Sequence, residues 1–290
     1  MTRLLSILTV LMTALSVSTA HAAAPKSHPA KAELVADVAS VSAGKPFTVG
    51  VRLTMEPHWH TYWLNPGDSG QPISVKWNLP EGFTASNLRF PVPMRFVQPG
   101  DIVGYGYEDE VMLLATITPP AKLPDSGGGA GVPLSANVRW LVCKDVCIPG
   151  KATVSLDLPI AAAGVEATPA NESLFSEWAS RTPVAAADVL AGGKIASVRK
   201  QSNDEYVVQL RWAKPVQNVE WFAPASDDLT FSEAKVEQNG DTSTVTFTAR
   251  PLDKEAPANF KPLMATVAYV GEEGSRRGID VPLAALAEAK

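Results

Sequence analysis

Residues 47–55 have the sequence FTVGVRLTM, in which large apolar side chains alternate with small or polar ones. A period of two is typical of a β-strand that buries one face. The same alternation recurs at residues 73–77, 136–142 and 154–158, and residues 111–117 form a further apolar run. The chain has 24 prolines and 20 glycines, many of them clustered between these segments. Short strands separated by such turns predict an all-β fold built around a β-sandwich.

The chain of 290 residues is long enough for two domains of ordinary size. In the connecting segment, Thr168-Pro169 predicts the start of a short helix with Leu174, Phe175 and Trp178 on one face. We therefore expect a signal peptide (1–22), a flexible N-terminus (23–32), a β-sandwich with the cysteine pair (33–160), a linker with a short helix (161–182) and a second, smaller β domain (183–290).

The second half of the chain repeats the strand pattern but carries neither cysteine nor histidine. Asn239-Gly240 lies between two apolar runs and predicts a tight hairpin turn. The sequence alone gives this half no task. Its expected strands are residues 205–212, 219–222, 229–236, 242–249, 263–270 and 278–283.

The N-terminus has the pattern of an export signal. Arg3 precedes an uncharged apolar run, Leu4–Val17, and Ala20-His21-Ala22 gives a small-x-small cleavage pattern. The run is shorter than the roughly 20 residues that span a bilayer, so cleavage after Ala22 is favoured over a permanent anchor. We expect a periplasmic protein whose mature chain does not insert into the membrane. A net charge of -5 without a basic stripe also makes a nucleic-acid partner a poor fit.

The chemistry is concentrated in Cys143 and Cys147, the two cysteines of the chain. An even number of cysteines in an exported protein suggests a disulfide. Closing a loop of about five residues stabilises by roughly 2 kcal/mol, against about 4.7 kcal/mol for a 100-residue loop. A domain of this size builds its core without so local a bridge. An exchanging pair is therefore favoured, while a structural bridge and a metal site stay open.

Two charged residues lie between the cysteines and are candidate modulators of the thiol pKa. Lys144 favours the thiolate form, and Asp145 opposes it. Because the two effects offset each other, the sequence does not say which cysteine attacks.

His58 and His60 would share a face with Tyr62 if all three lay on one strand. Two imidazoles on one face can hold a metal ion, although an exposed strand face is the simpler interpretation. A Cu(I) site of both cysteines with a histidine or Met94 is chemically sensible, because thiolate and thioether suit Cu(I). We otherwise expect no cofactor and no metal.

Four segments occur in a recognisable order: HWHTYW (58–63), NPGDSGQP (65–72), GYGYE (104–108) and CKDVCIP (143–149). Together they resemble the N-terminal periplasmic domain of the DsbD family of thiol:disulfide interchange proteins. The chain is similar in particular to the ScsB-like branch, which is linked to copper tolerance. The resemblance covers roughly residues 33–160.

The resemblance implies an immunoglobulin-like β-sandwich and a pair, Cys143 and Cys147, that cycles between dithiol and disulfide. It implies a protein-disulfide reductase that passes electrons between a redox partner and periplasmic substrate proteins. The partners would be thioredoxin-like proteins and a membrane electron donor acting in trans. It also implies a loop over the thiols, with Ile102, Val103 and Tyr105 as the shielding side chains. The alternatives are a copper-binding protein and a non-catalytic module with a structural disulfide.

Overall fold

The computed structural model describes residues 28–123, 131–162, 165–185, 193–202, 204–253, 260–261 and 263–288. The expected signal peptide and its cleavage site at Ala22 lie outside these residues. Within the described part no helix is long and apolar enough to cross a membrane.

The fold is all-β, as predicted, and begins with an immunoglobulin-like sandwich of two sheets. One sheet has the strand order β1-β2-β8-β5, and the other has the order β10-β9-β3-β7-β6 with β4 paired to β9. The strands are β1 (Ala30–Ala36), β2 (Phe47–Met55), β3 (His60–Gly67), β4 (Ser74–Asn78), β5 (Thr84–Ala85), β6 (Met94–Gln98), β7 (Ile102–Glu108), β8 (Glu110–Thr118), β9 (Val132–Cys143) and β10 (Cys147–Leu158).

The alternation that predicted the sandwich corresponds to its core. On β2, Val49, Val51 and Leu53 are buried, whereas Thr54 is exposed. This inward face packs with β8, β9 and their neighbours into one hydrophobic cluster. The predicted strand at residues 47–55 is therefore confirmed to the residue.

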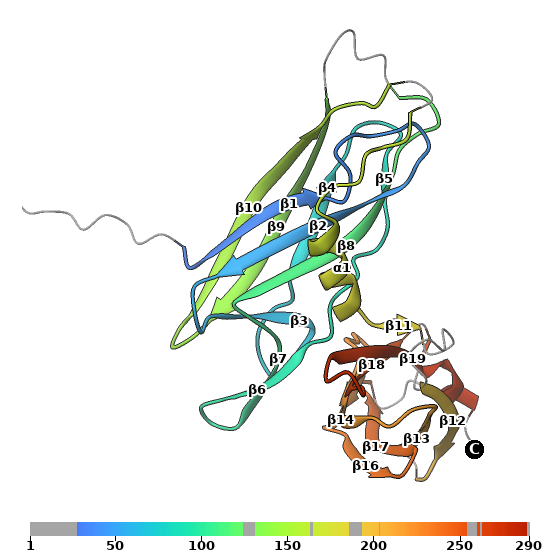
Figure 1. The fold of residues 1–290 in the computed structure, drawn as a ribbon. Coiled ribbons are helices and arrows are strands. Elements are labelled where there is room, and N and C mark those ends of the chain that lie inside the picture. The colour runs from blue at the N-terminus through green and yellow to red at the C-terminus, as the bar shows by residue number, and fades with distance from the viewer. Residues whose placement is uncertain are drawn as a thin grey trace, which may run out of the picture.

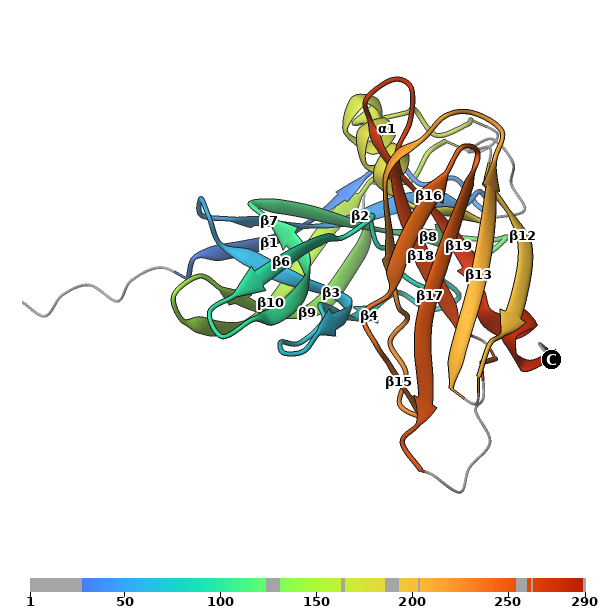
Figure 2. The ribbon, with the colours of Figure 1, turned by 90° about the horizontal axis from the view of Figure 1, so that it is seen from below.

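A second β domain follows helix α1 (Glu172–Arg181) and also contains two sheets, in the orders β11-β19-β18-β14 and β12-β13-β17-β15, with β16 paired to β17. Figures 1 and 2 both show α1 at the junction of the two domains. The strands are β11 (Val184–Ala185), β12 (Gly193–Lys200), β13 (Glu205–Trp212), β14 (Gln217–Phe222), β15 (Leu229–Phe231), β16 (Lys235–Asn239), β17 (Thr242–Pro251), β18 (Met264–Val270) and β19 (Arg276–Pro282), and a 3₁₀ helix covers Leu283–Glu288.

Three local expectations need correction. Strand β1 begins at Ala30, inside the segment expected to be flexible, because it pairs with β2 from Ala30↔Met55 onward. Asn171, in the left-handed conformation, caps α1 in place of Thr168-Pro169, since Pro169 is held in a bridge with Val38. The hairpin at Asn239 is present, but its two turn residues are Gly240 and Asp241.

Aromatic packing joins the two domains. Phe222, on β14 of the second domain, is buried in the hydrophobic cluster of the first. Its ring lies 6.0 Å from Trp63 and 5.3 Å from Tyr105, centroid to centroid, in edge-on geometry. Burial of a ring of this size contributes much of the stability at such a contact.

Polar contacts surround this aromatic contact and involve strand β6 and the residues that precede it. Arg276 donates a hydrogen bond of 2.7 Å to the carbonyl oxygen of Pro93. Arg95 forms an ion pair of 2.9 Å with Glu233. The β6–β7 hairpin is thus held on one side by the second domain.

Candidate functional site

The β9–β10 hairpin brings the two cysteines together. Its register pairs Cys147 with Cys143, and Lys144–Val146 form the turn between the strands. The two sulfur atoms are bonded, with the Cα atoms 4.1 Å apart. The disulfide suggested by the sequence is therefore present at the end of an antiparallel ribbon.

The two halves of the disulfide differ in exposure. Cys143 is 1% exposed, at the end of the buried strand β9. Cys147 is exposed at the start of β10, on the outer strand of its sheet. A thiol that approaches from solvent therefore meets Cys147 first.

Tyr62 contacts the buried cysteine directly. Strand β3 pairs with the end of β9 at His60↔Cys143 and Thr61↔Val142. The hydroxyl of Tyr62 donates a hydrogen bond of 3.1 Å to Cys143 Sγ, and the tyrosine is itself 1% exposed. A donor aimed at sulfur stabilises negative charge when that sulfur becomes a thiolate.

Gln98 extends this contact into a hydrogen-bonded chain. Its side-chain nitrogen donates to Tyr62 Oη at 3.2 Å and lies 2.9 Å from Nε2 of His60. An amide nitrogen only donates, so Nε2 of His60 accepts, and the imidazole is neutral with its proton on Nδ1. Desolvation by burial lowers the pKa of His60, opposed by the nearby charge of Glu108.

Phe96 covers this polar chain. Its ring centroid lies 4.3 Å from that of His60 and 6.0 Å from that of Tyr62. Gly104 leaves the space that the ring occupies, because a Cβ there would lie 2.2 Å from Phe96. The aromatic ring that covers His60 and Tyr62 thus comes from β6.

The predicted shielding set needs correction at two of its three members. Gly104 and Gly106 pair with Phe96 and Met94, so the strand alternation of β7 places Val103 and Tyr105 on the opposite face. Tyr105 packs against Phe222 of the second domain instead. Ile102 remains on the same face as Phe96 and is 37% exposed.

The two charged candidates lie in the turn of the hairpin. Lys144 and Asp145 are both exposed. Lys144 Nζ donates a long hydrogen bond of 3.5 Å to the carbonyl oxygen of Pro57. Neither forms an ion pair among the described residues, so their effect on the thiols is that of solvated charges.

The histidines do not form the pair that the sequence suggested. His58 has a φ of 68° in the turn before β3, and its ring lies 3.6 Å from a Glu108 oxygen. It therefore does not share a strand face with His60. The described residues contain no group of three His, Cys, Asp or Glu side chains that could hold a metal ion, and Met94 is 43% exposed on β6.

Sequence reasoning missed Phe96 and Gln98 and gave Tyr62 no role beyond its strand face. Both missed residues lie on β6, which reaches the site only through its pairing with β7. The alternation of Met94, Phe96 and Gln98 would have marked one face, but nothing in it indicates a sulfur partner.

The fold and the site define a class: an immunoglobulin-like β-sandwich with one disulfide at the end of a hairpin. Residues 29–159 match the family described as thiol:disulfide interchange protein DsbD, N-terminal. This segment is therefore a DsbD N-terminal-like domain, as the sequence resemblance implied.

One solved structure extends the likeness of fold to both domains. The N-terminal periplasmic domain of ScsB from Proteus mirabilis matches over 89% of this chain and 95% of that chain, with 19% identity and a TM-score of 0.62. The DsbD N-terminal domain of Neisseria meningitidis in the reduced form matches over 48% of this chain and 88% of that chain, with 13% identity and a TM-score of 0.29. A search of curated proteins found no match.

Proposed function

We propose that the protein is a periplasmic thiol–disulfide exchange protein that passes electrons to disulfide-bonded substrate proteins through Cys143 and Cys147. The observation that carries the proposal is the asymmetry of the disulfide. Cys147 is exposed, whereas Cys143 is buried and accepts a hydrogen bond from the Tyr62 hydroxyl. The match of residues 29–159 to the DsbD N-terminal family supports it.

In the reducing direction the exposed cysteine acts first. The Cys147 thiolate attacks one sulfur of a partner disulfide, a mixed disulfide forms, and the partner's other sulfur leaves as a thiolate. The Cys143 thiolate then attacks Cys147 Sγ and expels the partner's first sulfur. Two electrons have passed to the partner, and the Cys143–Cys147 disulfide has formed again.

Recharging the protein reverses these steps. A donor thiolate attacks Cys147 Sγ, and Cys143 leaves as a thiolate. The Tyr62 hydroxyl, 3.1 Å from Cys143 Sγ, stabilises the charge that develops on this leaving group. Gln98 holds the tyrosine oxygen from the other side and so orients its proton toward sulfur.

The expected partners follow from the same family match. They are thioredoxin-like periplasmic proteins and a membrane-bound electron donor in trans. Export through the signal peptide would place the chain in the periplasm, the compartment of the similar ScsB domain.

Trapping of mixed disulfides tests the proposal. In Cys143→Ala the exposed Cys147 has no resolving partner, so we expect it to accumulate stable mixed disulfides with periplasmic proteins. Cys147→Ala leaves only the buried thiol and is the matched control, expected to trap at least tenfold less. Equal trapping by both variants would contradict the assigned order, and no trapping by either would contradict exchange.

The reduction potential separates exchange from a structural bridge. A structural disulfide has a potential below about -300 mV, whereas exchanging pairs lie higher. We expect a potential clearly above that value when the chain is equilibrated with glutathione buffers and its thiols are then counted.

A further inference from the structure

A second feature lies on the same face of the β9–β10 ribbon as the disulfide. Side chains two residues apart on a strand point to the same side, so Arg139 shares a face with Cys143, and Lys151 shares it with Cys147. Four residues at about 3.3 Å each put these cations roughly 13 Å from the disulfide along the strands. The feature is therefore within reach of any protein docked on the cysteines.

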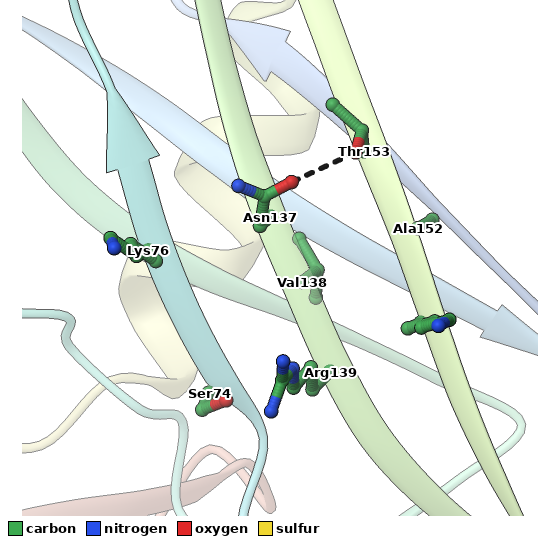
Figure 3. A pocket seen from close by; sticks show the side chains of 8 residues that line it. Ser74, Lys76, Asn137, Val138, Arg139, Ala152 and Thr153 are labelled. Carbon is green, nitrogen blue, oxygen red and sulfur yellow. Dashed lines mark hydrogen bonds between the residues drawn. The ribbon is translucent and has the colours of Figure 1, made fainter.

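Three cations gather there on neighbouring strands. Arg139 lies directly opposite Lys151 in the β9–β10 register, and Lys76 of β4 is opposite Asn137, one pleat further along. All three side chains are exposed. Figure 3 shows Lys76, Arg139 and Ser74 around a shallow hollow in this face of the sheet. We call Lys76, Arg139 and Lys151 the cationic patch.

The positive charges of the patch have no ion-pair partner among the described residues. Like charges directly opposite each other in a sheet destabilise it. Among the described residues, the side chains of Lys76, Arg139 and Lys151 form no hydrogen bond, ion pair or cation–π contact, although their backbones are paired within the sheet. The whole chain carries a net charge of -5, so this concentration of positive charge runs against its overall balance.

The floor of the patch is polar and ordered. Thr153 donates a hydrogen bond of 2.8 Å to the Asn137 side-chain oxygen across the strands, which leaves the Asn137 amide group free to donate. Ser74 adds an exposed hydroxyl beside Arg139. Three cations with amide and hydroxyl donors fit carboxylates rather than an apolar partner surface.

We propose that the cationic patch is the docking surface for an acidic surface on the redox partner, next to that partner's reactive sulfur. This inference rests on the proposed function, because it assigns the partner's charge at the same site. Docked carboxylates would relieve the repulsion between Arg139 and Lys151 and would hold the partner's sulfur over Cys147. Steering by such charges acts mainly on the rate of encounter and weakens with salt.

The first test measures docking without any thiol chemistry. The probe is a fluorescent peptide with a run of glutamates and no cysteine, titrated with the oxidised chain at low ionic strength. We expect Lys76→Gln/Arg139→Gln/Lys151→Gln to bind it at least tenfold more weakly than the unchanged chain. The control Lys31→Gln/Lys122→Gln/Arg199→Gln removes the same charge from exposed positions elsewhere and should bind within twofold of the unchanged chain.

Three outcomes would overturn the docking surface. In the first, the unchanged chain does not bind the glutamate peptide. In the second, both triple variants bind this peptide equally more weakly than the unchanged chain. In the third, the patch binds inorganic phosphate, and the chain does not prefer the glutamate peptide to a lysine peptide. The last outcome would assign the patch to a small anion instead of a protein.

A separate arm reports on the proposed function. An uncharged peptide with its cysteine in a 2-pyridyl disulfide is mixed with the reduced chain, and release of the thiopyridone is followed. Both triple variants should reduce it at the rate of the unchanged chain, because its encounter needs no charge. If the unchanged reduced chain releases no thiopyridone, the result counts against disulfide exchange. The titration with the glutamate peptide still decides whether the cationic patch is a docking surface.

Discussion

The two β domains of this protein use the same construction for different ends. Each contains two sheets and a tight antiparallel hairpin, β9–β10 in the first and β16–β17 in the second. The first hairpin ends in a disulfide that touches a buried tyrosine hydroxyl. The second ends in Gly240-Asp241 and carries no sulfur. The disulfide and its contacts thus belong to one hairpin end and its neighbours, while a pair of sheets with a hairpin occurs in both domains.

The second domain nevertheless contributes to the first. Phe222 belongs to the hydrophobic cluster of the sandwich, and its partner Tyr105 lies on the strand next to Phe96. The face of the β6–β7 hairpin away from the disulfide rests on the second domain, and the other face covers His60 and Tyr62. We interpret the second domain as a support for the β6–β7 hairpin, which covers one side of the disulfide site.

The largest predicted effect breaks this support. Phe222→Ala should lower the free energy of unfolding by about 3–5 kcal/mol, because it removes a fully buried ring. It should also speed amide exchange at Tyr105. The control Phe231→Ala, at a half-buried ring inside the second domain, should cost less and leave Tyr105 unchanged. Guanidinium unfolding and hydrogen exchange measure both, and a loss below about 1 kcal/mol for Phe222→Ala would contradict the interpretation.

A glycine comparison sharpens the contrast between the domains. A Cβ at Gly106 would lie 1.8 Å from the Thr61 carbonyl oxygen, so Gly106→Ala should separate β3 from β7 and cost about 1–3 kcal/mol. It should slow disulfide exchange as well, since Tyr62 moves with β3. Gly240→Ala meets no atom within 4 Å but has a φ of 59°, so it should cost about 1 kcal/mol and leave exchange unchanged. Unfolding curves and exchange rates with a neutral thiol give both numbers.

The next largest effect is expected from loss of the hydrogen bond between Tyr62 and Cys143 Sγ. Tyr62→Phe removes the donor to Cys143 Sγ, and hydrogen bonds to charged groups contribute about 1.5–3 kcal/mol. We expect reduction of the disulfide by dithiothreitol to slow about tenfold or more.

Tyr107→Phe is the matched control, because its buried hydroxyl donates to the Pro91 carbonyl and does not touch sulfur. It should lower stability without changing the rate of reduction. A similar rate in the two variants would remove the role assigned to Tyr62.

The smallest effects are in the pH dependence, and the two domains should differ in sign. Burial lowers the pKa of His60, so its contribution to stability is present above the unfolded value of about 6.5 and is lost as the pH falls through the folded pKa. Burial raises the pKa of Asp280, so its contribution is present below 3.8 and is lost as the pH rises through the folded pKa.

Two variants test these signs. His60→Gln should flatten the stability profile between about pH 5 and 7, and Asp280→Asn should raise stability at pH 7 while it keeps the oxygen that accepts from Thr266. Denaturation midpoints at a series of pH values measure both. The same slope in His60→Gln as in the unchanged chain would contradict the first assignment.

The strands that the sequence predicted well are those with large alternating side chains. Residues 47–55 and 205–212 match β2 and β13 because branched and aromatic residues on one face alternate with polar ones on the other. Strand β1 was missed because three of the four side chains on its inward face are alanines, and it is stabilised by pairing with β2.

The cysteine pair could be predicted because its two members lie four positions apart, so any hairpin between them brings the sulfur atoms together. The side chains that contact the cysteine pair could not be predicted from the sequence. Gln98 lies 36 positions from Tyr62, and Tyr62 lies 81 positions from Cys143. Such contacts depend on sheet register, which no local pattern specifies.

Local sequence patterns were enough to predict an all-β fold, a local disulfide and the resemblance of roughly residues 33–160 to the DsbD N-terminal family, which the match of residues 29–159 confirms. Three features became visible in the folded chain alone: Cys147 is exposed, Tyr62 contacts Cys143, and Lys76, Arg139 and Lys151 share a face with the disulfide. The physical reason is that alternation fixes which way each side chain points along its own strand. Pairing between distant strands then fixes which side chains meet.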